Sequence, residues 1–185
     1  ELIDKGTINV ENCTLVNDRA GYAATGTHYS IIGIDGTGSS STAVLNFNNV
    51  KMVVANRIKI AYVKYGTWNI TDSELSNGTN AEGGGYNGIY TNSGAHVNLL
   101  RSSVYTPGTG NAFPFNIQGK SASASVVIEE SYLYGVKAVN AGSGYDAALT
   151  VKSGWFNTDI SDFANAEYVG TFGPCVPAAT YTHNG

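Results

Sequence analysis

The residues of this chain that could act as acids, bases or metal ligands are few and widely spaced. Asp72 and Glu74 lie two positions apart, and carboxyl groups work as an acid–base pair only when they lie close together in space. Asp35 precedes a glycine-rich turn that could hold a cation, although such turns are usually structural. No spacing typical of zinc ligands relates the three histidines, His28, His96 and His183. The sequence therefore predicts no catalytic residue, no metal site and no cofactor.

The tyrosines are the residues that best indicate binding. Exposed aromatic rings stack on sugar faces and make protein contacts at low entropic cost. We select as candidate ligand-binding residues Tyr62, Tyr65, Tyr86, Tyr90 and Tyr105. Further along the chain follow Tyr132, Tyr134 and Trp155. Packing between neighbouring strands explains the same rings equally well, so both interpretations stay open.

The two cysteines, Cys13 and Cys175, lie near opposite ends of the chain. Two unpaired thiols are the simplest interpretation. A disulfide needs Cα atoms within about 7 Å, so a bridge within the chain would require the tail to run back along the whole molecule. The alternative hypothesis is an intermolecular disulfide between Cys175 of one molecule and Cys13 of the next.

Charge and composition narrow the class of protein. The net charge is −4 and the basic residues are scattered, which excludes the basic surface of a nucleic-acid-binding protein. No run approaches the ~20 apolar residues of a membrane span. Only 13% of the residues are charged, and Asn, Gly, Ser, Thr and Tyr are abundant. This composition favours an extracellular or cell-surface protein.

A repeat organises the elements that must position these residues. The segment 66–75, GTWNITDSEL, resembles the segment 6–15, GTINVENCTL. Six segments align when one apolar column holds Ile8, Leu45, Trp68, Val97, Val126 and Leu149. Two residues later a second apolar column holds Val10, Phe47, Ile70, Leu99, Ile128 and Val151. The residues between the two columns are mostly polar, so each segment is predicted to be a strand with one face inward.

Each repeat is also predicted to bend and to be followed by a second strand. Asn12, Asn49 and Asp72 fall at the bend, because Asn and Asp tolerate the left-handed conformation that a sharp corner needs. Beyond the bend, one inward column of mostly small residues contains Cys13, Val50, Ser73, Ser102, Ser131 and Gly154. An outward column contains Asn9, Asn46, Asn69 and Asn98, which predicts a hydrogen-bonded ladder. The second strands are predicted over residues 31–34, 58–63, 88–90, 113–117 and 136–139.

The run Gly88-Ile89-Tyr90, a short turn, and then VNLLRSSV over residues 97–104 carries a family resemblance. It resembles the coil signature of right-handed parallel β-helices of the pectin-lyase-like superfamily, over about residues 6–157. The resemblance implies an all-β fold: a single-stranded right-handed parallel β-helix, or solenoid, of about six coils with a C-terminal cap. It says little about activity, since lyases, hydrolases, phage tailspikes, adhesins and surface proteins share this fold.

The enzymes of that superfamily carry clustered carboxylates, which this chain lacks. Glu11 and Glu129 fall in one outward column but four coils apart, or about 19 Å at the spacing of strands in a sheet. The triplets 157–159, NTD, and 57–59, RIK, match motifs of polygalacturonase-like hydrolases. Their order is reversed, and the Asp pair and Gly-His-Gly of that family are missing. We interpret both matches as coincidence.

These observations predict two regions and one function. Residues 1–159 are expected to form the coils and residues 160–185 the C-terminal capping segment. The expected function is that of a non-catalytic extracellular structural or adhesive module, including a subunit of a surface fibre or filament. The alternative is a protein that binds or cleaves a polysaccharide with a Tyr-rich lateral face. The expected partners are a polysaccharide or other copies of the chain.

Overall fold

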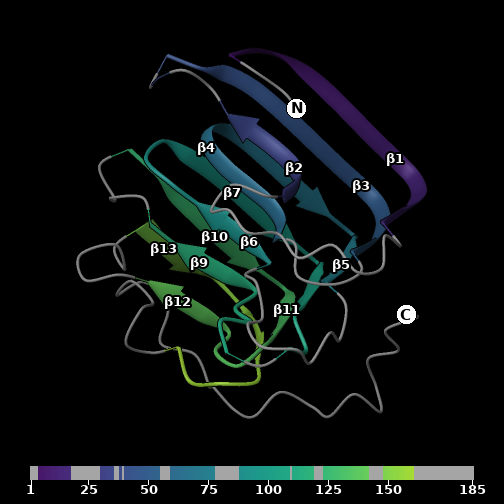
Figure 1. Cartoon of the computed structure of the whole chain (residues 1–185), viewed down its shortest axis with the longest axis vertical. Coiled ribbons are helices and arrows are strands. Elements are labelled where there is room, and N and C mark those ends of the chain that lie inside the picture. The colour runs from purple at the N-terminus through teal and green to yellow at the C-terminus, as the bar shows by residue number, and fades with distance from the viewer. Residues whose placement is uncertain are drawn as a thin grey trace.

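Parallel strands form almost all of the regular structure of this chain. The structure is a computed structural model, and it describes residues 4–17, 30–35, 38, 40–54, 59–77, 88–108, 110–118, 123–141 and 148–160. Fourteen strands belong to one curled sheet, and every strand pair that the structure describes is parallel. Figure 1 shows them stacked from β1, in purple, to β12 and β13, in green. The prediction of an all-β protein built from parallel strands is confirmed.

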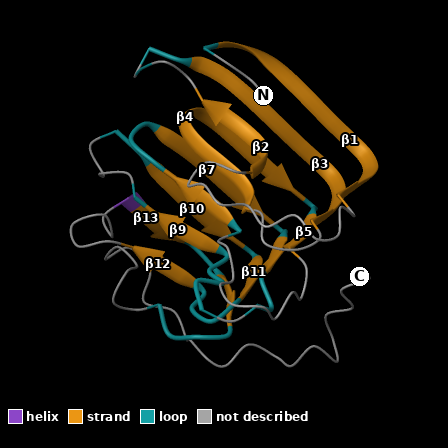
Figure 2. Cartoon of the chain, viewed as in Figure 1, coloured by secondary structure: helices purple, strands orange, loops and turns teal. Residues whose placement is uncertain are grey.

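The strands fall into three rows, which Figure 2 shows in orange with teal loops between them. The first row contains β2 (Ser30–Asp35), β4 (Lys59–Thr71), β6 (Ile89–Thr91), β9 (Phe115–Ile117) and β12 (Val139–Ala141). The second row contains β1 (Lys5–Asn17), β3 (Thr42–Val54), the end of β4, β7 (Ala95–Leu100), β10 (Ser125–Glu129) and β13 (Leu149–Val151). The third row contains the ends of β1 and β3, then β5 (Glu74–Asn77), β8 (Ser103–Tyr105), β11 (Ser131–Tyr134) and β14 (Gly154–Phe156).

The register of these rows confirms the repeat residue by residue. In the second row, strand pairing places in one column Ile8, Leu45, Trp68, Val97, Val126 and Leu149. In the third row, it places in one column Leu15, Met52, Leu75, Val104, Leu133 and Phe156. Side chains of these columns alternate with outward polar ones, so they meet in the interior between the rows. The six aligned segments are called repeats 1 to 6 below.

The interior is a continuous apolar stack. Phe47 and Trp68 lie at its centre, with ring centroids 5.2 Å apart and planes at 89°, the edge-to-face arrangement that aromatic pairs favour. Trp68, Ile70 and Leu75 are fully buried. Burial is less complete toward repeat 1, where Ile8 is 44% exposed. Each repeat thus contributes one layer to a shared core, as in other solenoids.

The bend between the second and third rows lies at one position of every repeat from 1 to 5. Five residues there have positive φ angles between 45° and 54°: Asn12, Asn49, Asp72, Arg101 and Glu130. The first three were predicted from their tolerance of this conformation. Arg101 and Glu130 were not, since the left-handed conformation costs such side chains about 1–2 kcal/mol. The neighbouring repeats hold them in register, which outweighs that cost.

Two other predictions concern the ends of the chain. Ile160 is fully buried, but residues 161–185, most of the predicted cap, lie outside the described residues, as does Cys175. Cys13 is a free thiol that packs against the edge of the core, as its place in the inward small-residue column predicts. Among the described residues, no helix has the length and apolar character needed to cross a membrane.

Candidate functional site

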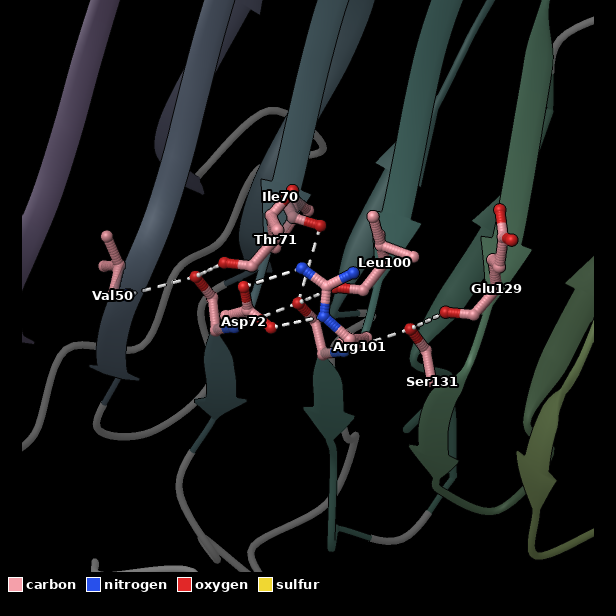
Figure 3. Close-up of polar contacts among 10 residues, drawn as sticks. Val50, Ile70, Thr71, Asp72, Leu100, Arg101, Glu129 and Ser131 are labelled. Carbon is pink, nitrogen blue, oxygen red and sulfur yellow. Dashed lines mark hydrogen bonds and ion pairs between the residues drawn. The ribbon is translucent and has the colours of Figure 1, made fainter.

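The carboxyl group of Asp72, which sequence analysis examined for catalysis, serves a structural role. Asp72 lies at the bend and forms a bidentate ion pair with Arg101 of the next repeat, with N–O distances of 2.7 and 2.8 Å (Figure 3). The hydrogen bond from Arg101 lowers the pKa of Asp72, and the same bond raises the pKa of Arg101. Asp72 therefore remains an anion and is a poor general acid.

Glu11 and Glu129 lie in one outward column, but far apart. Three register partners separate them, Asn48, Thr71 and Leu100, so four strand steps of about 4.8 Å lie between the two carboxylates. Glu129 accepts a hydrogen bond from the Lys152 ammonium group at 3.0 Å. The register thus agrees with the separation inferred from the sequence, and these two carboxylates cannot act on one bond.

Of the two hydrolase-like triplets, the one at residues 157–159 lies within the framework. Asn157 makes hydrogen bonds to both the amide and the carbonyl group of Gly135, at 3.0 and 2.5 Å. Thr158 accepts a hydrogen bond from the amide of Ala138 at 2.8 Å. These hydrogen bonds link repeat 6 to repeat 5. Arg57 lies outside the described residues, and Lys59 is buried, which lowers the pKa of its ammonium group by desolvation.

The remaining candidates for metal binding are dispersed. Asp35 pairs with Lys64 at 3.5 Å, and His96 shares a hydrogen bond with Ser125 at 2.9 Å. His28 and His183 lie outside the described residues. In the part of the chain that the structure describes, no three His, Cys, Asp or Glu side chains gather to hold a metal ion.

A buried serine ladder supports the bend from within (Figure 3). The hydroxyl groups of Ser73, Ser102 and Ser131 accept hydrogen bonds from backbone amides of the preceding repeat, at 3.0, 2.9 and 3.1 Å. Each hydroxyl also donates across the bend to the carbonyl group two residues earlier in its own repeat, at 2.7 Å. All three serines are at most 5% exposed, so these groups have no water to replace a lost bond. These hydroxyls are structural and not nucleophiles.

Outside the bend lies an open groove of about 430 Å³ across repeats 1 to 3. Its lining includes the amides of Asn12 and Asn49, the Lys51 ammonium group and the carboxylates of Asp72 and Glu74. Asn49 donates a hydrogen bond to Asn12 at 2.8 Å, and Asp72 is held by Arg101. The groove can offer hydrogen bonds to a polar ligand, but no aromatic ring lines it.

The predicted ligand-binding tyrosines lie on two different rows. Tyr62 and Tyr90 stack in the first row, with centroids 5.5 Å apart, and Tyr62 is only 8% exposed. Tyr65 lies beside Gly94, where an added Cβ would clash with its ring. Tyr105 belongs to the third row. Tyr86 lies outside the described residues.

Four aromatic rings gather on the outer face of the third row, and we call them the aromatic platform: Tyr105, Tyr132, Tyr134 and Trp155. Tyr134 pairs with Tyr105 of the preceding strand, and their rings stack with centroids 4.7 Å apart. Tyr132 pairs with Trp155 of the following strand. The three tyrosines are partly exposed and Trp155 is 55% exposed.

The platform follows directly from strand alternation. Leu133 lies between Tyr132 and Tyr134 and is fully buried, so both tyrosines point outward. Burial raises the pKa of the Tyr105 hydroxyl, and the charge of ionised Tyr134 raises it further. Both effects favour the neutral form of the Tyr105 hydroxyl. The spacing of Tyr132 and Tyr134 around an apolar residue was the sequence signal for this surface, and one of the five selected tyrosines, Tyr105, belongs to it.

Comparison with models of protein families, with curated proteins and with solved structures finds no match for this chain.

Proposed function

We propose that this chain is a non-catalytic adhesive module that holds a polysaccharide against the aromatic platform. In this proposal the framework is a right-handed parallel β-helix of about six coils, of the pectin-lyase-like type, and it works outside the cell or at the cell surface. The observation that carries the proposal is the platform itself. It presents four neutral rings on three adjacent strands, and Trp155 is the most exposed of them.

A flat array of rings suits a sugar polymer for physical reasons. The apolar faces of pyranose rings pack on aromatic faces, and tyrosine hydroxyl groups at the rim can exchange hydrogen bonds with sugar hydroxyls. Strands in a row are about 4.8 Å apart, so rings on paired positions of neighbouring strands are close enough to stack, as Tyr105 and Tyr134 do. Binding without cleavage is favoured because the carboxylates Asp72, Glu11 and Glu129 are paired or far apart, whereas glycoside hydrolysis needs two within about 5–9.5 Å.

The test is binding of the full chain to an array of plant, algal and bacterial polysaccharides, followed by titration of the best ligand. We expect Trp155→Ala to weaken binding by roughly two- to tenfold, the value of one aromatic stacking contact. Trp155 is more than half exposed, so this change should leave the fold intact, which circular dichroism checks. Val136→Ala is the matched control, since Val136 is 46% exposed and lies outside the platform.

Two results would overturn the proposal. One is the absence of binding to every polysaccharide on the array. The other is equal affinity of the native chain and the Trp155→Ala variant, which would move any sugar-binding site away from the platform.

A further inference from the structure

The outer edge of β1 is an open end of the sheet. Among the described strands, β1 pairs only with β3, although it is thirteen residues long. The inward side chain of Ile8 is 44% exposed, while Leu45 in the next repeat is 5% exposed. Val10 and Leu15 are only partly buried. Figure 1 shows β1 at the outer end of the stack. An unpaired strand edge above an exposed core is a template for a further strand.

The hydrogen bonds of the asparagine ladder all run in one direction, and this determines which groups the edge of β1 offers to a neighbouring strand. Three hydrogen bonds of 2.8 Å link Asn98 to Asn69, Asn69 to Asn46 and Asn46 to Asn9. In each of them the side-chain Nδ2 of the later repeat donates to the Oδ1 of the earlier one. Asn9 therefore uses its Oδ1, and its Nδ2 donates to no described residue. The predicted ladder is confirmed, and it ends on an unused donor.

A second donor of the same kind lies three residues away. Asn49 donates to the Oδ1 of Asn12 at 2.8 Å, which leaves the Nδ2 of Asn12 without an acceptor among the described residues. The edge of β1 thus combines backbone groups, an apolar strip at Ile8 and Val10, and two amide donors in register. The same kind of edge, with its Nδ2 donors, is what β3 presents to β1 and β4 presents to β3.

A second copy of this chain fits the edge poorly. Head-to-tail stacking would use repeat 6, but its inward side chains Leu149, Val151 and Phe156 are at most 1% exposed, so that end of the core is already covered. Head-to-head pairing would be antiparallel. With the two bends aligned at Asn12, inward Val10 would face the outward position of Thr14 in the second copy.

We propose that the edge of β1 accepts one further parallel β-strand, with a defined side-chain pattern. Side-chain carbonyl oxygens of Asn, Gln or Asp face Asn9 and Asn12, three residues apart. Apolar residues face Ile8 and Val10. A basic residue faces Glu11, as Lys152 faces Glu129 in the same column at 3.0 Å. Backbone hydrogen bonds supply affinity and these positions supply specificity, as in other cases of strand addition.

The probe is a fluorescein-labelled peptide with the sequence of residues 42–54 and the change Asn48→Lys. It carries Leu45, Asn46, Phe47 and Asn49 at the positions that meet β1. The control peptide has in addition Asn46→Val and Asn49→Gly, which remove both acceptors while Gly keeps the bend accessible. Fluorescence anisotropy with the full chain should give saturable binding of the probe, and binding of the control peptide should be at least about fivefold weaker.

Two protein variants locate the binding surface. Ile8→Lys places a charge in the apolar strip and should reduce probe binding at least about tenfold, because inward charges block strand addition. Val136→Lys, an equally exposed apolar position on another part of the surface, should leave binding unchanged. Thermal unfolding verifies that both variants fold.

Equal binding to the Ile8→Lys variant, or no saturable binding of the probe, would overturn the proposal. Sedimentation velocity of the chain alone gives a further check. A dimer that Ile8→Lys dissociates would identify a second copy as the occupant and would equally overturn it. None of these readouts depends on the binding of a polysaccharide.

Discussion

Repeats 1 and 6 carry the same pattern of residues in opposite surroundings. Ile8 and Leu149 occupy one column, but Ile8 is 44% exposed and Leu149 is fully buried. Val10 and Val151 share the next column, and only Val151 is fully buried. The pattern therefore determines which way a side chain points. The neighbouring repeats determine how deeply that side chain is buried, and therefore how much it contributes to the stability of the fold. This is expected where each repeat contacts only its neighbours.

The largest expected effect comes from shortening two side chains of the same column to alanine, one in each of these repeats. Leu149→Ala should lower the free energy of unfolding by about 2–5 kcal/mol, since it leaves a cavity in a covered core. Ile8→Ala should cost less than about 1 kcal/mol, because nearly half of that side chain already contacts water. Urea unfolding of both variants measures the difference. Equal losses would mean that repeat 1 is as well covered as repeat 6.

A second test compares two positions of the inward column of small residues, Ser131 and Cys13. Ser131→Ala should cost about 1–3 kcal/mol, because the buried amide of Ser102 would lose its acceptor. The carbonyl group of Glu129 would also lose one of its two donors, the other being the amide of Arg101. Cys13→Ala, at the partly exposed end of the same column, should cost less than about 1 kcal/mol. Chemical denaturation again provides the readout. A loss below 0.5 kcal/mol for Ser131→Ala, on the order of experimental error, would indicate that water replaces the hydroxyl.

The smallest expected effect concerns the bend. Glu130 has a φ angle of 47°, which favours Asn, so Glu130→Asn should raise the free energy of unfolding by up to about 1 kcal/mol. The converse change, Asn12→Glu in repeat 1, should lower it by a similar amount. Thermal unfolding of the two variants distinguishes them. Changes of the same sign would show that side-chain contacts at the bend, and not backbone conformation, decide its stability.

The repeat could be predicted from the sequence because it depends on side-chain alternation alone. Trp68 aligns with Leu45 and Val97, and strand pairing keeps that register. Ile70 likewise aligns and pairs with Phe47 and Leu99. The bend was predictable where Asn or Asp marks it. At Arg101 and Glu130 the residue type gives no such signal, and the conformation follows from the bends of the adjacent repeats.

The candidate site was harder to predict, because ring contacts between strands depend on three-dimensional register. Tyr62 and Tyr105 looked equivalent in a list of tyrosines, yet one is buried in the first row and the other lies on the platform. Trp155 could be assigned to the platform only after strand pairing placed it beside Tyr132. The exposure of Ile8 could not be predicted from the aligned repeats either. The alignment shows which side chains point inward, but not which repeat lacks a neighbouring layer.

The serine ladder has a consequence for how such a chain can change in length during evolution. Ser102 and Ser131 occupy equivalent positions 29 residues apart. Loss of residues 102–130 would join Arg101 to Ser131, and both the bend and the column of hydroxyls would continue as before. Removal of a shorter segment would turn inward side chains outward or leave an amide without its acceptor. Duplications and deletions during evolution should therefore involve whole repeats. Insertions and deletions of other lengths should occur only in the loops between the rows.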